Sequence, residues 1–172
     1  AEEQAGSERT RFPSAALALA QLTGNGVEVL VLADCHVAVE LEDTSVVHVT
    51  SEPADLRVHR ERPADPDQAR ELLRRDRELR NTPGRLWVAR REPEAVQHAH
   101  LVRLPAPRRV VLASDGAWRA VDLGLVDSPC SFLRAASTPL GAQQLLLELR
   151  ERQAAVGEKA DDATILTVVP GA

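Results

Sequence analysis

The chain has 172 residues, a net charge of −5 and 44% hydrophobic residues, which is ordinary for one globular domain with a sizeable core. The negative charge and the 2% aromatic content argue against nucleic-acid binding, which needs basic patches or stacking platforms. No hydrophobic run approaches the roughly 20 residues of a membrane span, and no signal peptide is visible, so we expect a cytoplasmic protein that does not bind membranes. The distant Cys35 and Cys130 favour a reduced, intracellular protein.

The first third of the sequence predicts strands. We expect residues 1–12, which are polar and charged, to form a flexible lead-in to a single domain over residues 13–170. The sequence contains no methionine, not even at position 1, and we expect the natural chain to begin further upstream. A hairpin turn is predicted at residues 23–26, with Asn25 and its neighbouring glycines at positive φ. Short hydrophobic runs separated by turns predict an antiparallel meander over residues 14–22, 27–33, 37–41 and 45–50.

The pattern then changes to helices. Asp65 can cap a helix that has Pro66 at its first position and runs to about Arg80. We expect a short strand over residues 85–89 and a short helix over residues 93–100. A long helix over residues 139–156 is predicted from the Thr138-Pro139 start and from Gly157 at its end. Strands followed by amphipathic helices favour an α+β fold over a repeated βαβ arrangement.

The stretch Val110-Val111-Leu112-Ala113-Ser114-Asp115-Gly116 predicts a buried strand that ends abruptly in an aspartate. We expect Gly116 to allow a sharp turn there. A carboxylate at the tip of a buried strand is costly unless something pairs with it, and a divalent cation would pair with it well. The alternative is an aspartate that hydrogen-bonds its own turn.

A second acidic stretch precedes the last predicted strand. Asp161 and Asp162 are adjacent and are followed by Ala163-Thr164-Ile165-Leu166-Thr167-Val168. Neighbouring carboxylates repel each other, so the pair is more stable beside a cation. If this strand and the strand before Asp115 are neighbours, the two acidic stretches meet at one end of a sheet. We call Asp115 and the Asp161-Asp162 pair the two acidic corners.

These stretches resemble the last two motifs of the type 2C metal-dependent protein phosphatases, in which one strand ends in SDG and D-[DN]-x-[ST] opens the final strand. Residues 30–36, LVLADCH, resemble the hairpin motif of that family, and residues 13–20 resemble the strand before it. The motifs keep the family order over most of the chain. The segment around Arg80-Asn81-Thr82-Pro83-Gly84 is similar to a variant found in high-GC, actinobacterial-type bacteria.

The resemblance implies a four-layer α/β/β/α sandwich of antiparallel sheets flanked by helices. It also implies hydrolysis of phosphoserine and phosphothreonine in phosphoprotein substrates, with two Mn²⁺ or Mg²⁺ ions about 4 Å apart activating a water. Asp115 and Asp161 would be metal ligands, and Asp34 would match the aspartate that some members use for an extra metal. Asp162 and Gly116 would lie behind the ligands or on the substrate side. A hairpin-turn aspartate is the alternative for Asp34.

The sequence also departs from the family. The first Asp-Gly motif, an early Arg for phosphate and an early Glu for the second metal have no match, as if the N-terminal third of the domain were missing. Ala33, Cys35 and His36 replace the usual Gly, Ser and Arg of the hairpin motif. We therefore expect residues 1–172 alone to be inactive and a longer parent to be active. The alternative is an inactive, binding relative of the same fold.

Three other interpretations are weaker. Cys35 beside Asp34 and His36 suggests a thiol nucleophile, but strand neighbours point to opposite faces, which favours a structural cysteine. His98 and His100 lie two apart and do not share a helix face. An aspartate-nucleophile phosphatase of doubly wound fold needs Asp-x-Asp, and the residue two after Asp115 is Ala117.

Overall fold

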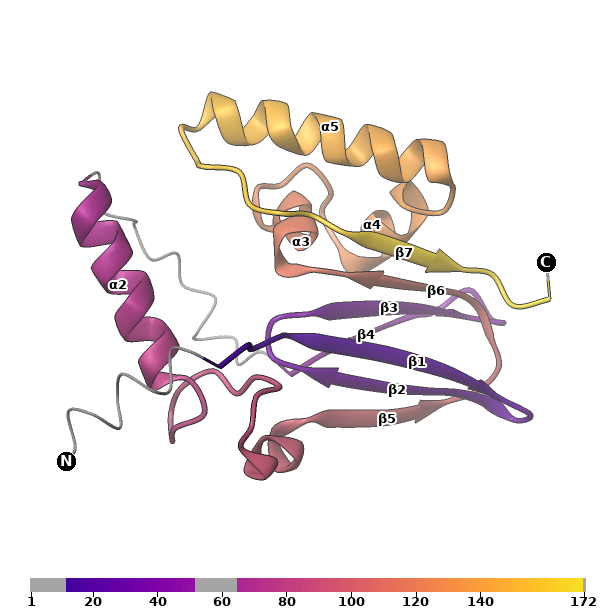
Figure 1. Ribbon diagram of the computed structural model, residues 1–172. Helices are drawn as coiled ribbons and strands as arrows, with labels where there is room; N and C mark the ends of the chain where they lie inside the picture. The colour runs from indigo at the N-terminus through magenta and orange to yellow at the C-terminus, as the bar shows by residue number, and fades with distance from the viewer. Residues whose placement is uncertain (1–11, 52–64, 172) are drawn as a thin grey trace.

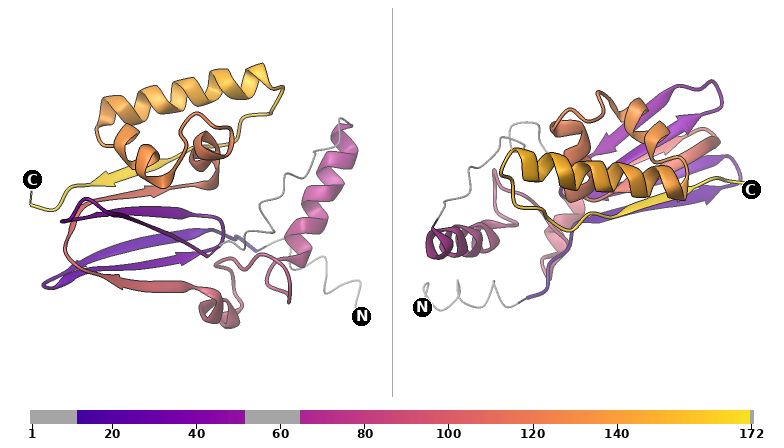
Figure 2. Two further views of the ribbon diagram at one scale, coloured as in Figure 1. Left: turned by 180° about the vertical axis from the view of Figure 1, so that it is seen from behind. Right: turned by 90° about the horizontal axis from the view of Figure 1, so that it is seen from above.

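A computed structural model describes residues 12–51 and 65–171, so residues 1–11 of the predicted lead-in lie outside the described residues (Figure 1). Two antiparallel sheets pack face to face, and helices cover the outer face of one of them (Figures 1 and 2). The predicted α+β class with two antiparallel sheets and helices is confirmed. Of the predicted four-layer α/β/β/α sandwich, the described residues show three layers, because helices cover only the four-stranded sheet. Its elements are β1 Leu17–Thr23, β2 Gly26–Leu32, β3 His36–Leu41, β4 Val46–Thr50, α2 Pro66–Leu79, the 3₁₀ helix η2 Pro93–His98, β5 His100–Leu104, β6 Pro107–Ala113, α3 Asp115–Asp122, α4 Pro129–Ala135, α5 Pro139–Ala155 and β7 Ile165–Val168.

The strands are divided between the sheets in a way that the meander prediction missed. One sheet has the order β1-β2-β5 and the other has the order β4-β3-β6-β7. The predicted hairpin between β2 and β3 is therefore wrong, because residues 33–35 carry the chain from one sheet to the other. Ala33 makes this step with φ at 72°, an unusual angle for a residue with a Cβ. The β1–β2 hairpin is confirmed, although Asn25 does not have positive φ.

Two hydrophobic layers hold the domain together. The layer between the sheets consists of valines from both sheets, which alternate with outward-facing residues as expected for period-2 strands. Its fully buried members are Val27, Val29, Val31, Val37, Val39, Val49 and Val110. The second layer lies between the four-stranded sheet and helices α3 to α5, and its larger side chains are Trp118, Phe132, Leu133, Leu145 and Leu149.

The long predicted helices are confirmed with their caps. The Asp65 carboxylate accepts a hydrogen bond from the backbone N of Asp67 at 2.7 Å, and Thr138 Oγ1 accepts one from Gly141 N at 3.1 Å. The predicted strand over residues 85–89 is reduced to one bridge between Ala15 and Ala89. The predicted helix over residues 93–100 stops at His98, and β5, which the sequence did not predict, begins at His100.

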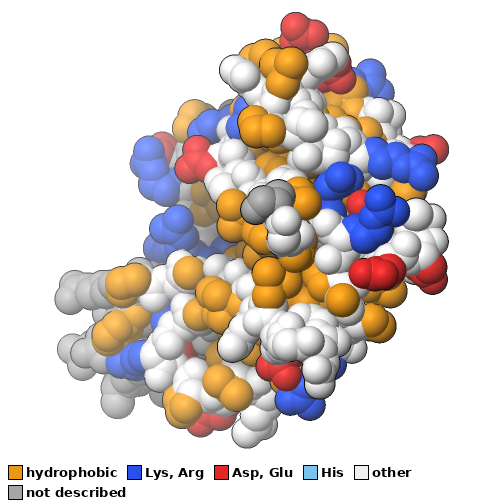
Figure 3. All heavy atoms as spheres, turned by 90° about the vertical axis from the view of Figure 1, so that its right-hand side faces the viewer, with side chains coloured by type: hydrophobic (Ala, Val, Ile, Leu, Met, Phe, Trp, Pro, Cys, Tyr) orange, Lys and Arg blue, Asp and Glu red, His pale blue; other side chains and the backbone are white. Residues whose placement is uncertain are grey.

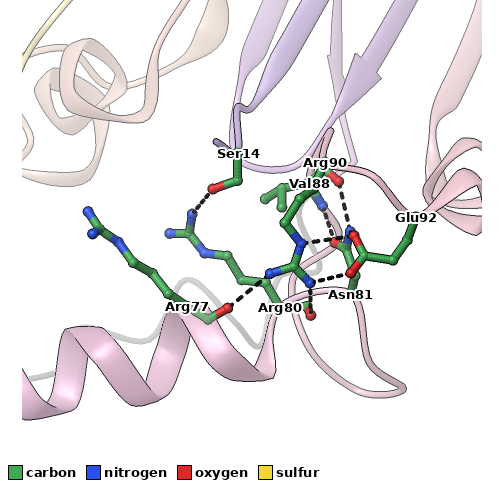
Figure 4. A network of polar contacts seen from close by, with 7 residues as sticks. All are labelled: Ser14, Arg77, Arg80, Asn81, Val88, Arg90 and Glu92. Atoms are coloured by element: carbon green, nitrogen blue, oxygen red, sulfur yellow. Dashed lines mark hydrogen bonds and ion pairs between the residues drawn. The ribbon is translucent and has the colours of Figure 1, made fainter. Parts of the chain in front are cut away.

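Helix α2 lies beyond the ends of the strands and contains no buried residue (Figure 1). The buried Arg90 side chain binds the C-terminal end of this helix by hydrogen bonds (Figure 4). Arg90 forms an ion pair with Glu92 at 2.8 Å, and its other nitrogens donate to the backbone oxygens of Arg77 at 3.3 Å and Arg80 at 3.1 Å. Asn81, at φ 58°, donates to the same Glu92 carboxylate at 3.1 Å. We call these five residues the Arg90 network.

The opposite end of the sandwich carries a hydrophobic patch at its centre. Figure 3 shows hydrophobic side chains gathered in the centre of this face, with Lys and Arg side chains on either side. Leu22 and Val169, near the ends of β1 and β7, are among the exposed hydrophobic residues of the described chain. No helix in residues 12–51 and 65–171 is long and apolar enough to cross a membrane.

Candidate metal-binding site

The two acidic corners lie side by side because β6 and β7 are neighbours. Their pairing places Ala113 opposite Ile165 and continues into the adjoining loops. Ser114 N donates to Thr164 O at 3.1 Å, and Thr164 N donates to Ser114 Oγ at 3.1 Å. The segment that carries Asp115 and the segment that carries Asp161 and Asp162 are therefore joined at the same end of the four-stranded sheet.

Asp115 is the first residue of α3. Ser114 caps this helix, because its Oγ accepts from Ala117 N at 3.4 Å while it also holds Thr164. The N-terminal end of a helix carries partial positive charge, which favours an anionic side chain there. The sequence analysis did not single out Ser114, although a serine directly before a helix start is a recognised cap signal.

Position 116 is a glycine because a larger side chain would not fit there, and not because the chain turns at this residue. It lies inside α3 and has no positive φ, so the predicted sharp turn at this glycine is wrong. A Cβ built on it would lie 2.1 Å from the backbone oxygen of Asp162. The second acidic corner is therefore packed directly against the backbone of the first.

Asp34 approaches the same place from the connection between the two sheets. It lies in the connection between β2 and β3, and β3 pairs with β6 so that His36 is opposite Ala113. The alternative interpretation of Asp34 as a hairpin-turn residue is wrong, because this connection joins two sheets. The end of β6 is thus flanked by Asp34 on one side and by Asp161 on the other.

The pKa of the Asp115 carboxyl group is raised above its ordinary value of 3.8. Partial burial is the main cause, and the negative charges of Asp34 and Asp161 add to it. Water still reaches the Asp115 residue, so the effect of burial is screened. Similar causes act at Cys35, where burial and the negative charges of Asp34 and Asp115 raise the pKa of the thiol to about 11. A thiol protonated at neutral pH is a poor nucleophile, in agreement with the structural interpretation of Cys35.

The donors fit a divalent cation in type but not in number. Carboxylate oxygens are the ligands that Mg²⁺ and Mn²⁺ prefer, and Asp34, Asp115 and Asp161 are close enough to interact electrostatically. Within the described part of the chain, however, no group of three or more His, Cys, Asp or Glu side chains is arranged to hold an ion. The three aspartates are a cluster of like charges and not a preassembled site.

An aromatic stack supports the cluster from the core, and the sequence analysis missed it. Trp118, three residues after Asp115, stacks on His36 with 4.4 Å between ring centroids and on His48 with 4.5 Å. Nδ1 of His36 and Nε2 of His48 are hydrogen-bonded at 3.1 Å. The stack joins α3, the helix that begins with Asp115, to β3 and β4, and the pairing of β3 with β6 brings these distant residues together.

The described structure is similar to solved structures of one class of enzyme. It matches a serine-threonine phosphatase 2C from Toxoplasma gondii with a TM-score of 0.53 and 19% sequence identity, over 97% of this chain and 61% of that protein. It also matches the serine/threonine phosphatase Stp1 from Staphylococcus aureus with a TM-score of 0.48 and 14% identity, over 98% of this chain and 62% of that protein. No family model and no curated protein match the sequence.

The fold is therefore that of the type 2C serine/threonine phosphatases, as the sequence motifs predict. The chain spans about 61% of the length of the Toxoplasma gondii protein.

Proposed function

We propose that this chain provides part of the metal centre of a protein phosphatase that hydrolyses phosphoserine and phosphothreonine in phosphoproteins. The type 2C fold supports the reaction class, and the SDG and DDAT motifs support the position of the centre at the end of β6. The proposed setting is the cytoplasm of a bacterium. Because the chain spans about three-fifths of its structural neighbour, the activity belongs to a protein in which the remaining ligands are present.

Each aspartate has a distinct role in this proposal. Asp115 and Asp161 would hold a Mn²⁺ or Mg²⁺ ion, with Asp34 as a further ligand, and Asp162 would lie toward the substrate. The bound ions supply charge neutralisation for the phosphate and an activated water. The protein keeps Asp115 at the N-terminus of a capped helix and keeps Asp161 on a loop whose next residue is packed against that helix, so the two side chains would have to turn towards each other to share an ion.

The observation that carries the proposal is the combination of close packing and unfavourable charge. Gly116 lies against Asp162, and the pKa of Asp115 is raised by partial burial, to which the charges of Asp34 and Asp161 add. Acidic groups that repel one another in a fixed arrangement are stabilised when a cation binds among them. Their convergence from both sheets requires long-range pairing and is not a local turn effect.

A titration of residues 1–172 with Mn²⁺ in a calorimeter tests the proposal. We expect saturable binding that EDTA reverses and that Asp115→Asn weakens at least 10-fold. Asp67→Asn is the matched control, because Asp67 is an exposed residue of α2 that pairs with Arg70 at the surface, and it should not change the affinity. Equal binding by the wild-type chain and Asp115→Asn would reject the assignment.

Hydrolysis of an aryl phosphate distinguishes the enzyme from a binding relative. We expect no turnover by residues 1–172 and Mn²⁺-dependent turnover by a longer protein that contains them, with loss of activity in its Asp115→Asn variant. Turnover by residues 1–172 would contradict the proposal that this chain holds only part of the centre. Activity that survives EDTA would contradict its metal dependence.

A further inference from the structure

Four side chains link α3 to the loop in front of β7. Arg119 binds Glu158 with two nitrogens, and the distance from its Nε to Oε1 is 3.1 Å. The same Oε1 accepts from Nε2 of the buried Gln153 at 3.0 Å. Arg150 donates to Oε1 of Gln153 at 2.8 Å and also donates to the backbone oxygen of Asp161. We call Arg119, Glu158, Gln153 and Arg150 the loop clamp.

The loop clamp runs between the two acidic corners. It starts at Arg119, one helical turn after Asp115, and it ends on the peptide group of Asp161. Residues 158–164 form no helix or strand, so side chains and a few backbone bonds hold them in place. Gln153 is 1% exposed, which makes the middle of the clamp a buried polar connection and not a pair of mobile surface groups.

The clamp opposes a repulsion that the site itself creates. Asp115 and Asp161 carry like charges, and their neighbours Gly116 and Asp162 are in backbone contact, which keeps the two charged residues close to each other. Without a counter-force, the loop could relieve the repulsion by moving away from α3. The bonds of Arg150 and Glu158 hold the loop near Asp115 in the absence of a cation, when the repulsion is greatest.

We propose that the loop clamp positions Asp161 relative to Asp115 and so raises the affinity of the acidic cluster for a divalent cation. The affinity part of this inference rests on the proposed function. The four side chains are positioning residues, because they act through the loop and through α3. Groups that orient metal ligands in this way commonly change metal affinity 10-fold to 100-fold when they are replaced.

Arg150→Met tests the inference, because it removes both hydrogen bonds and keeps the length of the side chain. In the metal-free chain, we expect the Ser114 and Thr164 amides to exchange hydrogen at least 10-fold faster, while the amides of β2 keep their rates. We expect the Mn²⁺ dissociation constant to rise about 10-fold. Arg150→Lys should recover part of both effects, since one ammonium group can reach one acceptor at a time. Arg74→Met, on exposed α2, is the control and should change neither quantity.

Unchanged exchange at Ser114 and Thr164 in folded Arg150→Met would overturn the positioning role, whether or not the chain binds metal. Glu158→Gln provides a second variant, and it should produce the same local increase. If both variants accelerated exchange equally in every strand, the clamp would be a general stabilising element and the inference would be wrong. If the wild-type chain did not bind Mn²⁺, the proposed function and the affinity part would fail, while the exchange comparison would still decide the positioning part.

Discussion

Gly116 and the backbone carbonyl of Asp162 are in direct contact across the junction of α3 and the loop before β7. A Cβ at position 116 would lie 2.1 Å from that oxygen and 3.0 Å from the carbonyl carbon. The contacted atoms belong to the backbone, so no side-chain rotation can relieve the overlap. The relationship makes position 116 a direct probe of the distance between the two acidic corners.

Gly116→Ala should therefore displace the loop that carries Asp161 and Asp162. We expect a loss of about 2–3 kcal/mol in the free energy of unfolding, as for overpacked core positions, and a large loss of Mn²⁺ affinity. Urea unfolding and calorimetric titration measure the two effects. Gly24→Ala is the control, because a Cβ there meets nothing within 4 Å, and it should be nearly neutral. Wild-type stability in Gly116→Ala would show that the contact is unimportant.

Asp115→Asn should change how stability depends on pH in the absence of metal. The folded-state pKa of Asp115 is raised from 3.8, so the folded protein binds this proton more tightly than the unfolded chain. Its contribution is therefore lost as the pH rises above about 4, and at pH 7 the ionised carboxylate is a net cost. We expect the wild-type chain to lose more stability than Asp115→Asn between pH 4 and pH 7 in metal-free urea unfolding. Parallel pH profiles for the two proteins would contradict the unfavourable charge cluster.

Arg90→Met should release the C-terminal end of α2. The Arg90 side chain is 2% exposed, and its removal takes the charged partner from Glu92, which keeps the hydrogen bond from Asn81, and a donor from two backbone oxygens. Breaking a buried ion pair in this way typically costs 3–5 kcal/mol, so we expect a loss of about 3 kcal/mol in urea unfolding. Arg74→Met, which breaks only exposed helix pairs, should cost no more than about 0.5 kcal/mol.

The same ion pair predicts an acid transition. Hydrogen bonds from Arg90 lower the pKa of Glu92 from 4.5 to about 2. The stabilisation is present above pH 4.5 and is lost as the pH falls towards 2. We expect the wild-type chain to lose stability over this interval and Arg90→Met to lose clearly less. Unfolding free energies measured at pH 5 and pH 3 give the comparison, and equal losses would show that Glu92 does not depend on Arg90.

Trp118→Ala should test the aromatic stack that joins α3 to β3 and β4. Trp118 is buried and contacts the rings of His36, His48 and Phe132. Removal of a buried tryptophan side chain costs about 3–5 kcal/mol, which urea unfolding would detect. Leu140→Ala, at an exposed position of α5, should stay within about 0.5 kcal/mol. If Trp118→Ala lowered the free energy of unfolding by no more than Leu140→Ala, the stack would contribute little to stability.

The helices were predictable because their signals are local. Asp65-Pro66 and Thr138-Pro139 specify a cap and a first turn within a few residues, and both helices begin as expected. The pairing of strands is not local. Residues 33–35 have the same length as a hairpin turn, and nothing in their sequence distinguishes a hairpin from a crossing between sheets. β5 was missed because His100 and Leu101 follow a short helical turn and are exposed.

The acidic motifs of the candidate site were predictable from the sequence. The contacts that hold these acidic residues in place were not. Asp115 and Asp161 each stand next to a recognisable strand, so their meeting required only that β6 and β7 be neighbours. The contact of Gly116 with Asp162 and the clamp from Arg119 to Arg150 depend on how α3 packs against α5. Such contacts leave no periodic pattern in a sequence, since an arginine or a glutamine on a helix reads as a solvated residue.

Asp34 is attached to the fold differently from the other two aspartates, because it lies in the crossing between the sheets at residues 33–35. Asp115 and Asp161 belong to segments that adjoin neighbouring strands of one sheet. Asp34 is attached at the joint between the two sheets. Because His36, two residues later, pairs with Ala113, the same aspartate is also tied to the sheet that carries Asp115 and Asp161. A strain on the β1-β2-β5 sheet would therefore reach the acidic cluster along the backbone of residues 33–35.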